Sequence, residues 1–437
     1  MNKITGTVMH EWMQEIFPFC RSITGSGVRD TLSFIKTILP DLEMMSVPTG
    51  YKAFDWTVPK EWNASDAWIK GPDNKKIAEF KVNNLHLVGY SIPIHKTMPL
   101  DELQHHLYSL EEQPSAIPYV TSYYKEQWGF CMRHADREKL QDGLYEVFID
   151  TKLEDGVLNY GEFFIEGNSA EEVLISTNIC HPSLANNELS GPIIATALAC
   201  WLTNQQKPEK SYRFVFIPET IGSLVFLSKK LAHLQKNVVA GYTLTCIGDD
   251  NHFSFLPSKF ENTLSDRAAF HYFKHADLSK GVKFYDWLER GSDERQYCAP
   301  GIDLPIASVM RSKYATFPEY HTSLDNLEFV TAQGLETSFD VVTQILTIID
   351  KNCFIKATKL GEPQLGPRGL RPIISTPQRD KNARILTDIL TFADGKTDLI
   401  ALSERINRPM QQLLENVDLL LKHGLLEKRT LSDLKKP

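Results

Sequence analysis

The chain has 437 residues, of which 42% are hydrophobic and 23% are charged, as is ordinary for a globular protein. Lys and Arg number 47 against 55 Asp and Glu, so the formal net charge is −8. This acidic balance argues against nucleic acid as the main partner, since phosphate binding needs clustered cations. No apolar run is long enough to span a bilayer, and the first residues do not resemble a secretion signal. We therefore expect no membrane partner.

The cysteines indicate a reducing environment. They number seven, an odd count, are widely spaced and form no Cys-x-x-Cys motif. A disulfide framework is therefore not expected, and a cytoplasmic location fits best. Most of them lie in apolar runs, where a buried small hydrophobic residue is a simpler interpretation than a nucleophile.

In chain order, the first two regions differ in character. Residues 8–39 have a helical pattern interrupted by a glycine-containing turn, and we assign 1–45 to the N-terminal part of the main domain. The next region is rich in Trp, Tyr, Val and Pro, with strand-like runs at 80–82 and 128–132. We predict that residues 46–165 form a β-rich inserted domain.

Residues 166–358 alternate between apolar runs and helical patterns. Runs that are apolar on both faces suit the strands of a buried, largely parallel sheet, and they occupy 173–177, 214–217, 242–247 and 306–310. Helical patterns occupy 191–204, 223–235 and 263–275. The alternation predicts an α/β fold: a three-layer sandwich around a central mixed, mostly parallel sheet.

The C-terminal part is expected to be a separate module. Residues 359–382 are rich in Pro and Gly and read as a linker. Residues 383–437 follow, with helical patterns at 385–392, 399–406 and 409–423, and we predict a winged helix-turn-helix. Seven basic and seven acidic residues in 383–430 leave no net charge, which disfavours DNA binding and favours packing or oligomerisation.

Polar side chains follow the ends of the predicted strands. His181, Glu219 and Asp249 come soon after three of them, and His321 lies in a loop after the fourth. Ligands of open α/β sheets bind beyond the carboxyl ends of the strands, so we expect these residues at one edge. Imidazole and carboxylate groups are good zinc ligands.

Each of these residues also has a structural interpretation. His181 is as easily a satisfied histidine near the core, with Asn186 and Asn187 capping the next helix. Glu219, just past a buried strand, is a natural general base because burial raises its pKa, but a helix cap would look the same. Alone, His321 is as easily structural as a metal ligand.

The polar cluster at 291–296 contains Asp293 and Arg295, which are candidates for contacts to a substrate. A solvated loop with local ion pairs is the alternative interpretation. No Gly-x-Ser-x-Gly elbow and no glycine-rich phosphate loop is present, so a serine hydrolase and a nucleotide-binding enzyme are disfavoured.

The order of these segments resembles the co-catalytic zinc exopeptidases of the aminopeptidase S type. His181, Ser190 with Gly191, Glu219 and His321 match that pattern in order and spacing. A closer resemblance is to a bacterial aminopeptidase-like family, linked with polysaccharide or natural-product gene clusters, that carries a β insertion and a C-terminal winged helix. The motifs that carry it cover nearly the whole chain, at 21–25, 54–59, 118–124, 180–183, 218–223 and 291–296.

Departures from the exopeptidase pattern change what the resemblance implies. Ser183, Asn187 and Thr220 stand where that family has acidic residues for two metals. The resemblance then implies one zinc ion at most. Its ligands would be His181, His321 and an oxygen of Glu188 or Asn187, with Asp249 in reserve.

The function expected on this basis is metal-dependent amide or peptide hydrolysis of aminopeptidase type. Glu219 would act as general base with Asp293 as a further catalytic residue, and Arg295 and Tyr123 would bind the substrate, a small peptide or an amide-containing metabolite. A catalytically inactive peptidase-fold binding protein and, less favoured, a DNA-binding regulator remain as alternatives. The insertion and the winged helix could also form the interface of a homo-oligomer.

Overall fold

The computed structural model describes residues 4–370 and 381–429. These residues form two compact units, which are described separately. The first contains the chain up to residue 261 together with 280–341, and the second contains 262–279 together with the chain from 342 onward. Within the described part, no helix has both the length and the apolar character needed to cross a membrane. All seven cysteines are free.

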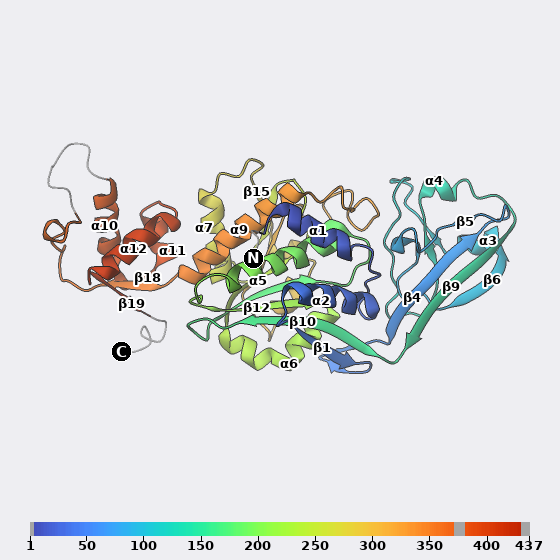
Figure 1. Ribbon diagram of the computed structural model, residues 1–437, viewed down its shortest axis with the longest axis horizontal. Helices are drawn as coiled ribbons and strands as arrows, with labels where there is room; N and C mark the ends of the chain where they lie inside the picture. Colours follow the sequence, from blue (N-terminus) through green and yellow to red (C-terminus); the bar gives the residue numbers. More distant parts are fainter. Residues whose placement is uncertain (1–3, 371–380, 430–437) are drawn as a thin grey trace. The chain divides into compact units, whose positions relative to one another are not determined.

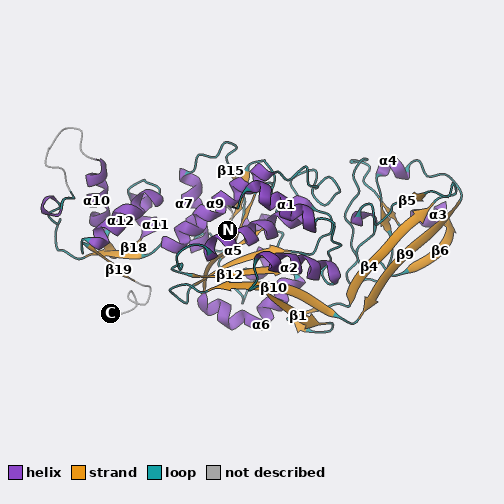
Figure 2. Ribbon diagram, in the orientation of Figure 1, coloured by secondary structure: helices purple, strands orange, loops and turns teal. Residues whose placement is uncertain are grey.

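A mixed eight-stranded sheet forms the centre of the first unit (Figure 2). Its strands, in spatial order, are β1 (Glu43–Pro48), β10 (Val157–Ile165), β12 (Ser211–Ile217), β11 (Glu172–Asn178), β13 (Val238–Leu244), β16 (Ile306–Met310), β14 (Phe253–Leu256) and β15 (Val282–Phe284). The four central strands, β12, β11, β13 and β16, run parallel to one another. Antiparallel pairs join β10 to β12, β1 to β10 and β14 to β16. Every residue of β11 and β12 is buried, as a two-sided apolar run requires.

Helices cover both faces of this sheet (Figure 1). One face carries α1 (Gly6–Ile16), α2 (Ser26–Ile38) and α5 (Ser190–Thr203), and the other carries α6 (Ile221–Asn237). Helix α5 is buried along almost its whole length, because α1 and α2 lie outside it. Further helical elements of this unit include α8 (Glu294–Tyr297), η3 (Trp287–Glu289) and the start of α9 (Ala332–Lys351). The predicted three-layer α/β sandwich is confirmed.

The region after β1 is rich in strands, as predicted. A four-stranded sheet contains β5 (Lys76–Ile77), β4 (Glu61–Lys70), β9 (Leu144–Glu154) and β6 (Ile94–Pro99) in that order. Shorter elements are β2 (Lys52–Ala53), β3 (Trp56–Thr57), η1 (Asn84–His86), α3 (Leu100–Gln104), β7 (Leu107–Tyr108), β8 (Phe130–Cys131) and α4 (His134–Arg137). Residues 80–82 are not a strand, because the backbone turns there and the Val82 N–H bonds to the carbonyl of Glu79.

The second unit holds the predicted winged helix. Its helices are α10 (Lys381–Phe392), α11 (Leu399–Arg405) and α12 (Gln411–Lys422), with η4 (Gly366–Arg368) before them. Its antiparallel sheet has the order β18 (Asp394–Asp398), β17 (Phe354–Ala357), β19 (Leu426–Arg429). The middle strand, β17, therefore comes from residues that the sequence analysis placed in the core domain. Residues 371–380 of the expected linker lie outside the described part.

Helix α7 (Leu264–His275) also belongs to the second unit. A guanidinium N–H of Arg267 donates to Asp398 at 2.6 Å, and the Met410 N–H donates to the ring of His271 at 2.9 Å. The sequence pattern predicted this helix correctly. A local pattern does not show, however, against which domain a helix packs. The proposed domain boundaries stay predictions.

Candidate active site

A cavity of about 380 Å³ opens beyond the carboxyl ends of β11 and β12, where the sheet topology leads us to expect a ligand. Its walls combine residues that follow these strands with residues of the β-rich region. The lining residues are Ile23, Trp56, Tyr119, Thr121, Tyr123, Tyr124, Cys180, His181, Glu219, Thr220, Ile221, Arg295, Gln296 and His321. Five of the candidate catalytic, metal-binding and substrate-binding residues therefore share one cavity: Tyr123, His181, Glu219, Arg295 and His321.

His181 is buried and lies shortly after the end of β11 at Asn178. Its Nδ1 lies 2.6 Å from an oxygen of Glu188, and its Nε2 lies 4.0 Å from an oxygen of Glu219. Burial disfavours the charged imidazole, but the neighbouring carboxylate of Glu188 outweighs this and raises the pKa of His181 overall. Because Glu188 occupies Nδ1, Nε2 is the ring nitrogen left for the cavity.

Glu188 lies behind His181. It comes from a π-helical turn, η2 (Ala185–Leu189), and its second oxygen accepts a hydrogen bond from the main-chain N–H of Cys180. Asp325 stabilises this turn, because its two oxygens accept hydrogen bonds from the N–H groups of Asn186 and Asn187 at 2.6 and 2.9 Å. Such a carboxylate orients a histidine and fixes its tautomer. Glu188 does not line the cavity, so its predicted role as the oxygen ligand stays a prediction.

Glu219 follows β12 and lines the cavity. Burial raises the pKa of its carboxyl group above the ordinary value. The Sγ of Cys180 accepts its main-chain N–H at 3.2 Å, and the next residue, Thr220, has φ of +64°. A carboxyl group with a raised pKa at a cavity wall has the properties of a general base.

Asp293 lies beneath Glu219 and does not line the cavity. One of its oxygens accepts the Thr220 N–H at 2.8 Å and the Ser223 hydroxyl at 2.9 Å, and the other is buried without a partner among the described residues. Burial, then the charge of Glu219, raises the pKa of Asp293 to about 8. A protonated Asp293 near neutral pH allows Glu219 to ionise without a like charge beside it.

His321 closes the cavity from the loop after β16. Its φ is +56°, a conformation that is uncommon for a residue with a side chain. Burial, then the nearby His181, lowers its pKa to about 3, so the ring is neutral at physiological pH. The rings of His181 and His321 are 5.3 Å apart between centroids, and Tyr320 stacks on His321 at 3.9 Å.

Two tyrosines of the β-rich region complete the site. The ring of Tyr119 contacts both imidazoles, at 5.0 Å from His181 and 5.2 Å from His321 between centroids. Its hydroxyl is 2.6 Å from that of Tyr123. Of these two tyrosines, only Tyr123 was predicted from the sequence. The aromatic motif at 118–124 was a signal for Tyr119, but nothing in it distinguished one tyrosine from another.

Two candidate oxygen ligands lie elsewhere. The side-chain oxygen of Asn187 is 3.6 Å from Cys246 Sγ, and neither residue lines the cavity. Asp249 accepts hydrogen bonds from the Asn186 side chain at 2.8 Å and from the Ser312 N–H at 3.1 Å. Its carboxylate therefore has a structural role, holding these two segments together. Asn186 therefore does not cap α5 with its side chain, and η2 leads directly into that helix.

The residues at the cavity fit a zinc ion. Zinc prefers neutral imidazole donors, and His181 Nε2 and the neutral ring of His321 are such donors at this cavity. The bond from Glu188 to Nδ1 is the supporting contact that metal-binding histidines usually have. The ligand atoms of Cys180, His181 and Glu188 also lie within 4.8 Å of one another.

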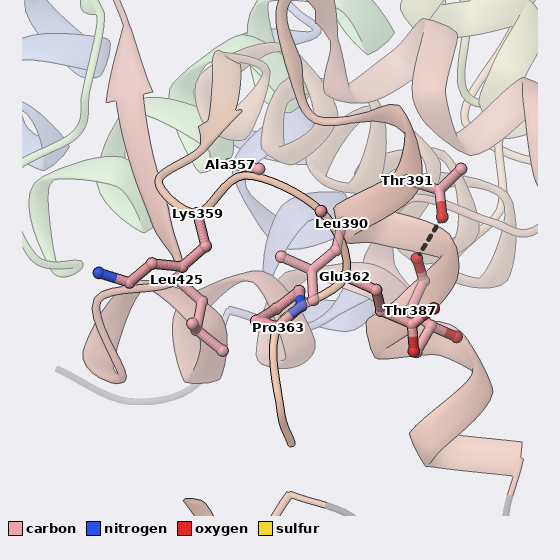
Figure 3. A pocket seen from close by; sticks show the side chains of 9 residues that line it. Ala357, Lys359, Glu362, Pro363, Thr387, Leu390, Thr391 and Leu425 are labelled. Atoms are coloured by element: carbon pink, nitrogen blue, oxygen red, sulfur yellow. Dashed lines mark hydrogen bonds between the residues drawn. The ribbon is translucent and has the colours of Figure 1, made fainter.

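The second unit contains a separate hollow of about 270 Å³ (Figure 3). It lies between the 357–363 segment, α10 and Leu425, and the Thr391 hydroxyl beside it donates to the carbonyl of Thr387 at 2.8 Å. Lys359 and Glu362 are the charged residues of its lining. Among the described residues, no histidine, cysteine or carboxylate pair lines this hollow.

The fold and the cavity define a protein of the aminopeptidase-like α/β class with a C-terminal winged helix. The chain belongs to the family described as a domain of unknown function (DUF4910), which matches residues 10–352. Residues 353–428 match a winged helix-turn-helix family. A relative from Clostridium acetobutylicum is 41% identical over 97% of this chain and 96% of its own length. It is named as a candidate polysaccharide biosynthesis protein with an aminopeptidase-like domain.

Solved structures agree with this membership. The crystal structure of a candidate peptidase from Clostridium acetobutylicum has a TM-score of 0.91 and 39% identity, covering 97% of this chain and 96% of that one. A zinc aminopeptidase from Bacillus subtilis has a TM-score of 0.56 at 12% identity, covering 79% of this chain and 95% of that one. At such low identity the second likeness shows the fold alone.

Proposed function

We propose that this protein is a metal-dependent hydrolase of amide or peptide bonds that uses a single zinc ion. The observation that carries the proposal is the 4.0 Å approach of Glu219 to His181 Nε2 in a cavity that His321 also lines. A carboxylate, two imidazoles and space for a substrate at one cavity support this proposal. The zinc-aminopeptidase fold supports the proposal as an analogy.

His181 and His321 would hold the ion, which supplies Lewis acidity toward the scissile carbonyl when bound. Glu219 would take a proton from the attacking water and pass it to the leaving nitrogen, which its raised pKa suits. Glu188 and Tyr119 would keep the two imidazoles in position. Asp293, buried beneath Glu219, acts in this scheme as a positioning residue for that carboxylate.

The natural substrate in this proposal is a small peptide or an amide-containing metabolite. The name of the relative from Clostridium acetobutylicum refers to polysaccharide biosynthesis. We propose a similar setting for this chain, in which the amide would be that of an acylated amino group.

The test is elemental analysis combined with amidase assays on the purified full chain. We expect close to one zinc per chain in the wild type, loss of zinc in His181→Ala, and zinc retained with activity at least 100-fold lower in Glu219→Gln. Glu138→Gln, at an exposed position, is the matched control. Equal activity of wild type and Glu219→Gln would overturn the role of Glu219 as base, and loss of zinc from that variant would identify it as a ligand.

A second candidate function is binding without catalysis. Both oxygens of Glu188 already contact protein groups, the Cys180 N–H and the His181 ring. Glu219 is then the one carboxylate among the described residues that line the cavity, and this shortage of acidic ligands favours binding without catalysis. Wild type that retains no zinc after mild purification would support this function over hydrolysis.

For the winged helix we propose a role in packing or in a homo-oligomer, not in reading DNA. Helix α12 carries Glu415 and Asp418, whereas a helix that enters a DNA groove is usually basic. Duplex binding by the full chain that weakens with salt would contradict this proposal.

A further inference from the structure

The charges around the cavity indicate what kind of substrate it accepts. The described residues of its lining include one carboxylate, Glu219, and one guanidinium, Arg295. In the proposed function Glu219 transfers the proton of the attacking water. No second carboxylate among the described lining residues is then left to bind the free ammonium group of an ordinary aminopeptidase substrate. The electrostatic environment therefore suits an anionic group better than a cationic one.

Arg295 is the residue available to bind an anion. It is exposed, and one of its terminal N–H groups donates to the Thr220 hydroxyl at 2.7 Å. Within the part of the chain that the structure describes, no carboxylate forms an ion pair with it. A planar guanidinium that is held at one nitrogen and free at the others can bind a carboxylate through two parallel hydrogen bonds.

The wall contributed by the β-rich region is aromatic. Trp56 and Tyr124 meet edge to face at 6.0 Å between ring centroids, and they remain 38% and 58% exposed. The Tyr124 hydroxyl donates to the carbonyl of Thr57 at 3.3 Å, which ties the two loops together. Exposed aromatic rings beside a cavity are a common surface for an apolar or ring-bearing ligand group.

The aromatic wall continues into a second hollow. A neighbouring space of about 220 Å³ shares Tyr123 and Tyr124 with the main cavity and is lined further by Lys60, Lys125 and Leu153 among others. A substrate group resting on Trp56 and Tyr124 would therefore have room to extend past them. This favours a substrate that is larger on its aromatic-facing side.

We propose that the site takes an N-acylated amino acid. Its carboxylate would bind Arg295, its acyl group would lie on Trp56 and Tyr124, and its amide would lie between them at His181 and Glu219. The proposal rests on the proposed function for its chemistry. In that reaction water adds its oxygen to the acyl carbon and the C–N bond breaks. The products are a carboxylate and the free amino acid, whose nitrogen takes the proton.

The test separates binding from turnover by using a ligand that cannot be cleaved. In 3-benzoylpropionate a methylene group replaces the amide nitrogen of N-benzoylglycine, and 3-benzoylpropionamide is its uncharged match. Binding of each to the zinc-loaded full chain is measured by isothermal titration calorimetry, with phenylalaninamide as the probe for a free amine. We expect the carboxylate probe to bind at least tenfold more tightly than either of the others.

Variants then assign the interaction to residues. Arg295→Gln should weaken the carboxylate probe about tenfold or more and leave the amide probe within twofold, while Trp56→Ala should weaken both probes alike. Arg290→Gln removes an exposed arginine that does not line the cavity, and it should change neither. Equal binding of acid and amide probes, tighter binding of phenylalaninamide, or no binding at millimolar concentration would overturn the proposal.

Failure of the proposed function and failure of this ligand class give different results. If the carboxylate probe binds through Arg295 but N-benzoylglycine is never hydrolysed, the ligand class stands and the hydrolase is wrong. If N-acylated amino acids are hydrolysed but Arg295→Gln raises KM no more for these substrates than for their amides, the hydrolase stands and this ligand class is wrong.

Discussion

The main-chain N–H of Tyr119 donates a 2.8 Å hydrogen bond to the carbonyl of His321, and the Ser323 N–H bonds in turn to the carbonyl of Ile117. Pro118 and Thr322 form an antiparallel bridge between these bonds. A loop of the β-rich region is thereby paired with the loop that carries a predicted metal ligand, about 200 residues further along the chain. His321 has a positive φ, which costs free energy, and this pairing helps to hold it there.

The first prediction concerns Tyr119, whose ring contacts both imidazoles. We expect Tyr119→Ala to weaken zinc binding by about 10- to 100-fold, since residues that orient metal ligands usually have effects of this size. Tyr119→Phe keeps the ring and loses only the hydroxyl bond to Tyr123, so it should stay close to wild type. Competition with a chelator of known affinity measures both. Equal weakening in the two variants would show that the hydroxyl, not the ring contact, matters.

The main sheet was predictable because its strands are buried on both faces. The predicted run at 306–310 coincides with β16, and 173–177 falls within β11. His181, Glu219 and His321 could then be placed at one edge, since the carboxyl ends of parallel strands lie at the same side of a sheet. Periodicity and topology together were sufficient for this part of the site.

The supporting residues were not predictable in the same way. The sequence left the oxygen ligand open between Glu188 and Asn187, and no sequence pattern indicated that η2 is π-helical or that Glu188 contacts Nδ1 of His181. Asp249 is close to the strand end in sequence, yet β13 ends at Leu244 and the following loop carries the carboxylate away to bond Asn186 and Ser312. Such outcomes depend on loop geometry, which residue spacing does not determine.

A second prediction tests Glu188 as the residue that orients His181. Glu188→Gln keeps the size of the side chain but removes its charge and changes the partner of Nδ1. We expect zinc affinity to fall by about 10- to 100-fold with the fold intact. Elemental analysis after dialysis against a chelator series measures the affinity, and circular dichroism checks the fold. If zinc affinity is unchanged, Glu188 neither binds the ion nor orients its ligand.

A third prediction concerns a buried ion network at the start of β11 and β12. Arg213, whose side chain is 7% exposed, donates to Glu172 at 2.8 Å and also bonds Glu162. Removing Arg213 leaves the buried carboxylates of Glu162 and Glu172 with only Lys230 and His233 as ion-pair partners among the described residues. We therefore expect Arg213→Ala to lower the free energy of unfolding by about 3 kcal/mol, the lower end of the range for a broken buried ion pair. Lys75→Ala, which removes a solvent-exposed ion pair with Asp73, should change it by less than about 1 kcal/mol. Urea denaturation measures both.

The same network should make the free energy of unfolding fall at acid pH. Burial would raise the pKa of Glu172, but bonds from Arg213 and His233 outweigh this and hold it below its ordinary value of 4.5. A carboxyl group with a lowered pKa in the fold stabilises it above the unfolded pKa and loses that contribution as the pH falls through the folded value. The wild type should therefore lose stability below about pH 4.5 more steeply than Arg213→Ala does. Parallel pH dependence of the two proteins would contradict this role for Arg213.

The last prediction concerns His271 in the second unit. Its Nε2 accepts the Met410 N–H at 2.9 Å, and its Nδ1 lies 2.5 Å from Glu404, which also pairs with Lys274. Burial lowers the pKa of His271 below 6.5, although Glu404 acts in the opposite direction. The neutral ring is therefore the folded form, and it must be the Nδ1–H tautomer for Nε2 to accept.

A histidine with a lowered pKa stabilises the fold above its unfolded pKa and loses that contribution as the pH falls through the folded value. Protonation puts a proton on Nε2 and removes the acceptor for Met410. We expect hydrogen exchange at the Met410 amide, corrected for its intrinsic pH dependence, to lose protection by up to about tenfold per pH unit below pH 6.5. In His271→Gln protection should be lower and independent of pH, while His423→Gln, at an exposed position of the same unit, should behave as wild type. Constant protection down to pH 5 in the wild type would show that the bond to Met410 does not depend on the charge of His271.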